Sequence, residues 1–151
     1  MSPEKTIDKM NEFLRGELSA VETYDLALGK TKHAELVASL QQLRDDHAQR
    51  VALIRQQIIA SGGAPSESSG AWGAFAKSVQ AGADLLGDAT ALAALEEGED
   101  HGLRMYRDAM SDDDLDATEV KSFVSTTLLP AEQKSHDTCR ALKRYAKTAA
   151  T

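Results

Sequence analysis

The chain has 151 residues, a formal net charge of −7 and only 5% aromatic residues. This length fits one domain that spans residues 1–151 and is long enough to bury a sizeable core. The negative charge argues against a nucleic-acid partner, because phosphate binding requires clustered basic side chains. A group of basic residues near the C-terminus is interpreted as a solvated helix face: Lys134, Arg140, Lys143, Arg144 and Lys147.

No segment has the apolar run of a signal peptide or of a membrane span. The single cysteine, Cys139, has no partner for an internal disulfide, and its apolar neighbours favour a buried position. We therefore expect a cytoplasmic protein that does not associate with membranes.

The first predicted helix begins near Ser2, with Pro3 in its first turn, and ends near Gly29. Its apolar residues fall at alternating steps of three and four and form one stripe: Ile7, Met10, Leu14, Val21, Tyr24 and Leu28. Glu17 lies in the middle of this stripe. A carboxylate that faces a core requires a charged partner, hydrogen bonds, a proton or a metal ion. Glu17 therefore marks a candidate site.

A second helix is predicted over residues 32–60, after a short connection that favours antiparallel packing against the first. Its apolar stripe consists of Leu36, Leu40, Leu43, Val51, Ile54 and Ile58. His47 lies at the centre of that stripe. Residues 61–65 end the helix, and residues 66–70 continue as a loop that could cross the end of the bundle.

A short extra helix is predicted around Trp72, where exposed apolar side chains could support a homodimer or cover the end of the bundle. Asp88 is a predicted N-cap for a third long helix over residues 89–110. The apolar stripe of this helix consists of Leu92, Leu95, Leu103, Tyr106 and Met110. Glu99 lies at its centre, as Glu17 and His47 do in their helices.

A fourth helix is predicted over residues 115–147, after an acidic turn at 111–114. Pro130 predicts a kink or a 3₁₀ turn near Leu129. The apolar face consists of Val124, Leu128, Ala131, Cys139, Leu142 and Tyr145. Glu132 and His136 lie on its flank, four residues apart and therefore on one side of the helix. They either reach the core or form an exposed pair.

These elements predict an all-α fold, an antiparallel four-helix bundle with an extra short helix between helices 2 and 3. Local segments resemble the ferritin-like superfamily. Residues 16–24 resemble the first-helix ligand segment of bacterioferritins, residues 46–50 the second-helix histidine segment, and residues 99–110 the third-helix segment that begins with a ligand glutamate. The resemblance implies that Glu17, His47, Glu99 and His136 are metal ligands; Glu132 is the alternative to His136.

Nearly the whole chain is similar to a family described as DUF2383, four-helix-bundle proteins of unknown function. The string at residues 95–100, the Trp72 segment and the pair His136-Asp137 carry this similarity. The chain also departs from ferritin-like metal centres. Two-metal carboxylate centres take a Glu-x-x-His motif from each of two helices, whereas Arg44 and Gln133 stand three residues before the two histidines.

Three arrangements are therefore open. In the first, one divalent ion of iron, zinc or manganese binds to a mixed imidazole and carboxylate set. That set is Glu17, His47, Glu99 and either Glu132 or His136. In the second, no metal binds and Arg44 supplies the compensating charge. In the third, two metals bind with non-standard bridging ligands.

The leading functional hypothesis is metal binding connected with iron handling or oxidative stress, a role that the family resemblance implies. The alternative is a non-catalytic bundle that acts as a structural or protein-interaction module. The sequence has no nucleophile–base arrangement and no glycine-rich phosphate loop of known spacing. We therefore assign no catalytic residue and leave enzymatic activity open.

Overall fold

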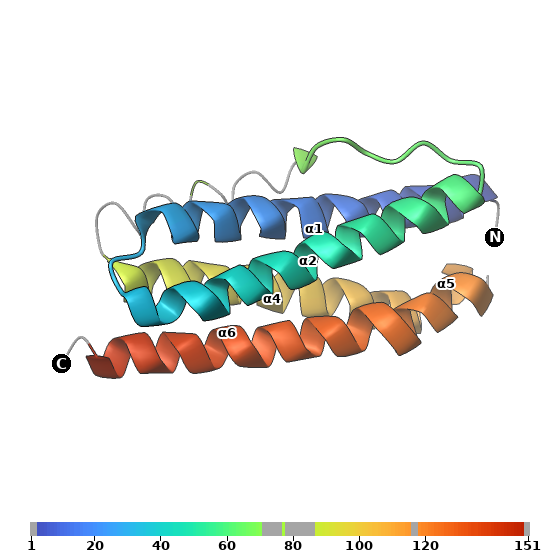
Figure 1. The fold of residues 1–151 in the computed structure, drawn as a ribbon. Helices are drawn as coiled ribbons and strands as arrows, with labels where there is room; N and C mark the ends of the chain where they lie inside the picture. Colours follow the sequence, from blue (N-terminus) through green and yellow to red (C-terminus); the bar gives the residue numbers. More distant parts are fainter. Residues whose placement is uncertain (1–2, 71–76, 78–86, 116–117, 150–151) are drawn as a thin grey trace.

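Four long helices make up most of the described chain (Figure 1). In the computed structural model the described residues are 3–70, 77, 87–115 and 118–149. The long helices are α1 (Pro3–Lys30), α2 (Ala34–Ala60), α4 (Asp88–Ser111) and α6 (Leu129–Ala149). No strand occurs in the described residues, so the predicted all-helical bundle is confirmed. None of their helices is long and apolar enough to cross a lipid bilayer.

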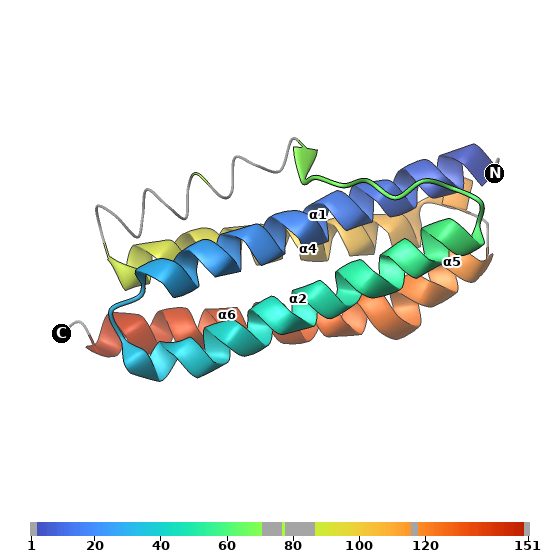
Figure 2. The ribbon, with the colours of Figure 1, turned by 45° about the horizontal axis from the view of Figure 1, so that its top comes forward.

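Neighbouring helices run in opposite directions (Figures 1 and 2). Helices α1 and α6 run toward the end of the bundle that holds the C-terminus, and α2 and α4 run away from it. The most extensive contacts join α1 to α2 and α4 to α6. Helix α2 ends at one end of the bundle, and α4 begins at the other.

The residues that follow α2 run back along α1 instead of crossing the end of the bundle (Figure 2). Asn11 Nδ2 donates to the Ala64 carbonyl at 3.0 Å, and Ser66 N donates to Asn11 Oδ1 at 2.8 Å. Farther along, Ser69 Oγ donates to Glu22 Oε2 at 3.0 Å. The predicted crossing is therefore wrong for these residues. The predicted short helix around Trp72, with its homodimer contact, lies outside the described residues.

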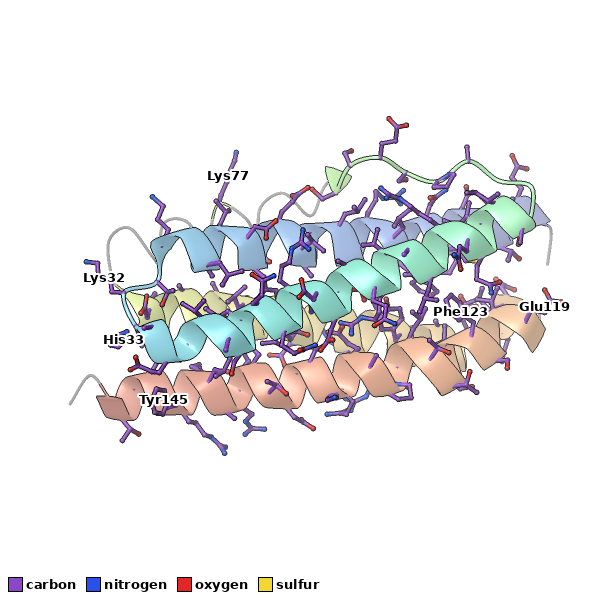
Figure 3. The ribbon with its side chains drawn as sticks, viewed as in Figure 1. Lys32, His33, Lys77, Glu119, Phe123 and Tyr145 are labelled. Carbon is purple, nitrogen blue, oxygen red and sulfur yellow. The ribbon has the colours of Figure 1, made fainter. Side chains whose placement is uncertain are left out.

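Asp88, the first residue of α4, binds the connection between α1 and α2 and does not cap α4. Gly87 occupies the N-cap position with a φ of +88°, a left-handed backbone that favours glycine. The Asp88 carboxylate instead accepts hydrogen bonds from Thr31 Oγ1 at 3.0 Å and Lys32 N at 3.2 Å. His33 Nδ1 lies 2.5 Å from the same oxygen. The predicted capping role is thus wrong, because the connection between α1 and α2 binds this carboxylate instead. Figure 3 labels Lys32 and His33 in that connection.

The last predicted helix is continuous over residues 118–149 but contains a wider turn. After a 3₁₀ turn, η2 (Asp113–Leu115), the chain forms α5 (Thr118–Phe123), the π-helical segment η3 (Val124–Leu128) and then α6. Leu129 N–H bonds to the Val124 carbonyl, five residues back. Pro130 has no N–H to continue the α-helical pattern. A π turn therefore replaces the predicted 3₁₀ turn, and its extra residue shifts the register of α6.

The core has two apolar halves. One lies toward the N-terminal end and consists of Met10, Phe13, Leu14, Val51, Ile54, Ile58, Tyr106, Ala109, Leu115, Val120, Val124 and Leu128. The other consists of Tyr24, Ala27, Leu36, Leu40, Leu43, Leu92, Leu95, Cys139 and Ala146. The burial of Cys139 is confirmed, whereas Tyr145, predicted on the apolar face, is 48% exposed (Figure 3). On each long helix, the residues between the two halves include buried polar groups.

Candidate functional site

Five charged side chains meet between the two apolar halves. We call them the core cluster: Glu17 from α1, His47 and Arg50 from α2, Glu99 from α4 and Glu132 from α6. None of them exposes more than 3% of its surface. Charged groups are almost never buried to this degree unless they are paired. The partners of these groups therefore define what the site can do.

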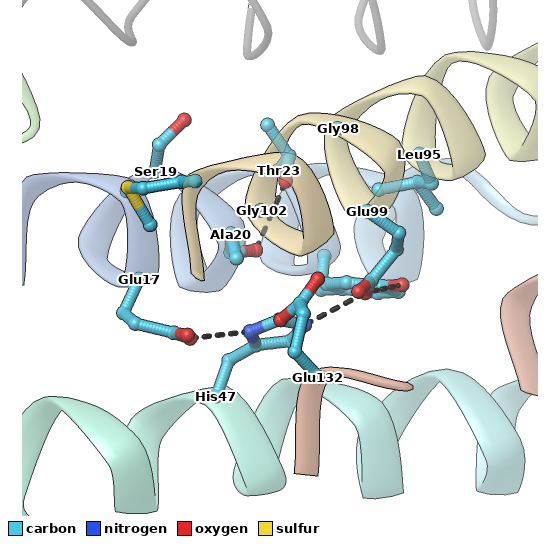
Figure 4. Close-up of a pocket in the computed structure, with 13 residues that line it drawn as sticks. Glu17, Ser19, Ala20, Thr23, His47, Leu95, Gly98, Glu99, Gly102 and Glu132 are labelled. Atoms are coloured by element: carbon cyan, nitrogen blue, oxygen red, sulfur yellow. Dashed lines mark hydrogen bonds and ion pairs between the residues drawn. The ribbon is translucent and has the colours of Figure 1, made fainter. Parts of the chain in front are cut away.

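His47 lies between two carboxylates (Figure 4). Its Nδ1 is 2.6 Å from Glu17 Oε2, and its Nε2 is 2.7 Å from Glu99 Oε1. Each carboxylate also accepts a hydrogen bond from a buried tyrosine: Tyr106 donates to Glu17 Oε1 and Tyr24 to Glu99 Oε1, both at 2.7 Å. A continuous hydrogen-bonded chain therefore runs from Tyr106 through the imidazole to Tyr24.

Arg50 connects this chain to α6. Its Nε donates to Glu17 Oε1 and its Nη2 to Glu132 Oε2, both at 3.0 Å. The two terminal nitrogens also donate to Ser135 Oγ at 3.2 Å. Nη2 lies 2.7 Å from His47 Nδ1, so the guanidinium and the imidazole are in direct contact. A cationic His47 is tolerable beside Arg50 because carboxylates from three helices surround the pair.

The charges in the core cluster shift each other's pKa values in opposite directions. Burial alone would raise the pKa of Glu17, but Arg50 and His47 outweigh burial and lower it. The pKa of Glu99 falls to about 2, because the attraction of His47 exceeds the cost of burial. Burial alone would lower the pKa of His47, but Glu99 and Glu17 raise it against the opposing charge of Arg50. These directions favour two ionised carboxylates and an imidazolium.

The pKa of Glu132 is shifted in the opposite direction from the pKa values of Glu17 and Glu99. Burial raises its pKa well above the ordinary value, and the neighbouring charge of Glu99 raises it further. A protonated Glu132 makes the core cluster neutral, because Glu17 and Glu99 then balance His47 and Arg50. If instead all three carboxylates are ionised and His47 is neutral, Arg50 leaves the core cluster with a charge of −2. Two protons, or one divalent cation, would neutralise that charge.

Gly102 gives the Glu132 carboxylate the space it occupies. A Cβ at Gly102 would lie 2.6 Å from Glu132 Oε1. A cavity of about 30 Å³ lies beside the core cluster, between α1 and α4 (Figure 4). Small residues form much of its wall, among them Gly16, Ser19, Ala20, Thr23, Gly98 and Gly102. This volume exceeds the roughly 10–15 Å³ that one water molecule requires, so the space suits a water molecule or a single ion.

The five predicted metal ligands divide into two groups. Glu17, His47 and Glu132 each offer a ligand atom, and these atoms lie within 4.8 Å of one another. Glu99 bonds to the opposite nitrogen of His47. His136 lies outside the core cluster, where its Nε2 is 2.5 Å from Asp100 Oδ1. Of the two flank residues, Glu132 therefore reaches the core, whereas His136 faces Asp100 on α4, outside the core cluster.

Arg44 does not compensate the buried carboxylates, so that prediction is wrong. Its side chain is 33% exposed and its Nε donates to Asp25 Oδ1 at 3.0 Å. Arg50 takes the role instead, because its position on α2 directs it into the core toward α1 and α6. The sequence contained a signal for this: Leu43, His47, Arg50 and Ile54 follow steps of four, three and four.

The donor set does not fit a two-metal carboxylate centre. Such centres direct single glutamates from two helices and Glu-x-x-His motifs from the other two helices into the core. Here the single glutamates are present, but the inward pairs are His47-x-x-Arg50 and Glu132-x-x-Ser135. An arginine stays protonated and does not ligate metals. One bridging carboxylate and both motif histidines are therefore missing.

The comparisons with known proteins give one match. A family model described as "Domain of unknown function (DUF2383)" matches residues 5–112. This match covers α1, α2 and α4, and therefore Glu17, His47, Arg50 and Glu99, but not the α6 residues of the site. A search of curated proteins and a search of solved structures each found no match.

Proposed function

The chain belongs to the DUF2383 family, and we propose that its core cluster binds one divalent metal ion inside an antiparallel, ferritin-like four-helix bundle. The ligands are Glu17, His47 and Glu132. The observation that carries this proposal is the convergence of three ligand atoms, from three helices, within 4.8 Å of one another. Imidazole and carboxylate ligands together suit zinc, iron or manganese.

Glu99 orients the proposed ligand His47 rather than binding the ion itself. Metal-bound histidines usually donate their second ring N–H to a carboxylate. The 2.7 Å contact between His47 Nε2 and Glu99 Oε1 is such an arrangement, and Tyr24 holds Glu99 in place. His47 Nδ1, beside Glu17, would then face the ion in place of Arg50 Nη2, which lies 2.7 Å from it.

The charge of the core cluster supports one ion rather than two. A divalent cation would neutralise the −2 charge that remains when Glu132 is ionised and His47 is neutral. Its binding would release the two protons that otherwise sit on these groups, and affinity should therefore rise with pH. The ion would stabilise the contacts between α1, α2 and α6. The connection with iron handling or oxidative stress, which the ferritin-like resemblance implies, stays a prediction.

The test is metal analysis of the untagged, full-length protein, followed by calorimetric titration of Zn²⁺ and Mn²⁺ at pH 6 and pH 8. We expect tighter binding at pH 8 and a dependence of the enthalpy on the buffer that reports proton release. His47→Gln and Glu17→Gln should each weaken this binding at least about 10-fold, since even supporting residues of metal sites contribute that much. Glu22→Gln is the matched control, because Glu22 is an exposed carboxylate on the same helix as Glu17.

The proposal fails if the two core variants bind each metal as the Glu22→Gln control does. It also fails if affinity does not rise between pH 6 and pH 8. Circular dichroism and thermal unfolding of every variant distinguish loss of a ligand from loss of the fold.

A second candidate is a metal-free structural or protein-interaction bundle, in which Arg50 and two protons balance the carboxylates. The hydrogen bonds from Arg50 to Glu17 and Glu132 favour it, because they already occupy both carboxylates. Under this alternative no metal binds to the core at either pH, and Arg50→Met lowers stability without changing metal content.

A further inference from the structure

A second cluster of ligand-type side chains lies outside the core. Glu96 and Asp100 project from the same side of α4, one helical turn apart, and His136 faces them from α6. Ligand atoms from the three residues lie within 4.8 Å of one another. We call these three residues the α4–α6 site. It shares no residue with the core cluster.

The α4–α6 site is accessible to solvent, yet its imidazole is held in position. The Asp100 side chain is 45% exposed, whereas those of Glu96 and His136 are only 14% and 11% exposed. An ion could therefore arrive from solvent without any opening of the bundle. Nε2 of the buried His136 ring lies 2.5 Å from Asp100 Oδ1. A metal cation could replace the proton that these two atoms share.

In the described part of the chain, Glu96 and His136 each have one buried polar atom without a hydrogen bond. These atoms are Glu96 Oε2 and His136 Nδ1, and His136 Nδ1 lies 3.6 Å from Asp137 Oδ1. Glu96 Oε2 is instead in close contact with a single cation, Lys143 Nζ, at 2.5 Å. Lys143 is 25% exposed, and a long ammonium side chain on α6 can turn into solvent when another cation binds.

We propose that Glu96, Asp100 and His136 form a second divalent-metal site, independent of the core cluster, in which the metal ion displaces Lys143. One imidazole and two carboxylates match the preferences of Zn²⁺, Fe²⁺ and Mn²⁺. Three protein ligands leave coordination positions for water, the arrangement of an open rather than a closed structural site. Because it shares no ligand with the core cluster, this site does not depend on the proposed function above.

The test is titration of Zn²⁺ into the untagged full chain, measured by calorimetry, with variants of each cluster. Asp100→Asn and His136→Gln should remove one binding event, or weaken it at least about 10-fold, while His47→Gln leaves that event unchanged. Glu97→Gln is the matched control, because Glu97 is an exposed carboxylate between Glu96 and Asp100. Lys143→Gln should strengthen binding at the α4–α6 site, because it removes the competing cation.

Stronger Zn²⁺ binding in Lys143→Gln distinguishes a metal site from a merely structural cluster. A structural cluster would lose a favourable ion pair and would show no gain in Zn²⁺ affinity. The proposal is overturned if Asp100→Asn and His136→Gln titrate as Glu97→Gln does, or if Lys143→Gln leaves affinity unchanged. Failure of the core site has a different signature. In that case the wild type shows one event, which Asp100→Asn removes and His47→Gln does not.

Discussion

Helix α2 carries two arginines that bond to carboxylates in opposite environments. Arg50 is 3% exposed and reaches Glu17 and Glu132 across the middle of the bundle. Arg44, less than two turns earlier, is paired at the surface with Asp25 and Asp45. The chemistry of the two networks is the same, a guanidinium with carboxylates, and their bond lengths to the first partner are both 3.0 Å.

The two networks differ in what can compensate the carboxylates when the arginine is lost. At Arg44, water can solvate any group that loses its pair, so the pair contributes little to stability. Arg50 is only 3% exposed, so bulk water cannot replace it, and a stranded carboxylate has to become protonated or remain uncompensated at high cost. Burial, rather than hydrogen-bond geometry, therefore decides which arginine matters. The predictions below test this contrast in order of decreasing effect.

Arg50→Met should have the largest effect. It removes the charge that lowers the pKa of Glu17 and strands two buried carboxylates, so we expect a loss of about 3–5 kcal/mol in the free energy of unfolding. Urea denaturation at pH 7 measures this loss. A loss below about 1 kcal/mol, the level of an exposed pair, would show that burial does not separate the two networks.

Gly102→Ala should come next, because the core cluster leaves no room for a methyl group at this position. Alanine is the better helix former, yet its Cβ would lie 2.6 Å from Glu132 Oε1. Overpacking of this kind costs about 1–3 kcal/mol. Gly29→Ala is the control, because Gly29 is exposed in α1 and a Cβ there meets nothing within 4 Å. It should stabilise the protein by up to about 1 kcal/mol; equal effects of the two substitutions would contradict the packing argument.

The pH dependence of stability should distinguish the carboxylates of the core cluster. The pKa of Glu132 is raised in the folded protein, so its contribution is present below 4.5 and is lost as pH rises through its folded pKa. His47 acts in the same direction above 6.5. Glu99 acts oppositely: its contribution is present above 4.5 and is lost as pH falls toward its folded pKa of about 2.

Stability should therefore fall as pH rises from 5 to 8 and also as pH falls from 4.5 to 2. Glu132→Gln, which mimics the protonated carboxyl group, should flatten the first decline and leave the second. Urea denaturation across this pH range checks both limbs. His33→Gln separates the surface contribution of His33, whose pKa is raised by its hydrogen bond to Asp88. An unchanged slope in Glu132→Gln would exclude a raised pKa of Glu132.

Arg44→Leu should have the smallest effect. Both carboxylates that it pairs with have side chains that are 53% exposed and can be solvated by water. We expect a loss below about 1 kcal/mol and, under the proposed function, unchanged metal binding. A loss comparable to that of Arg50→Met would mean that the Arg44 network is not a surface network in solution.

The sequence by itself determined the helices and the centre of the site. Apolar steps of three and four residues are a local property of each helix, so they predicted the four long helices. They also placed Glu17, His47 and Glu99 on the inner faces, where the structure has them. The capping of α4 and the turn before Pro130 were predicted wrongly. Asp88 bonds to the distant α1–α2 connection, and Pro130 follows a π turn whose type the sequence did not specify.

Only the tertiary structure decided which side chains complete the core cluster. Glu132 reaches it past Gly102, a contact between α6 and α4 that no pattern within one helix contains. Arg50 rather than Arg44 bonds to the buried carboxylates, because Arg50 lies between α1 and α6. His136 contacts Asp100 instead of the core cluster. Charged residues at the edge of a helix's apolar face have side chains that can reach several neighbours. Their partners depend on the angle and register of helix packing, which arise from the whole bundle rather than from local spacing.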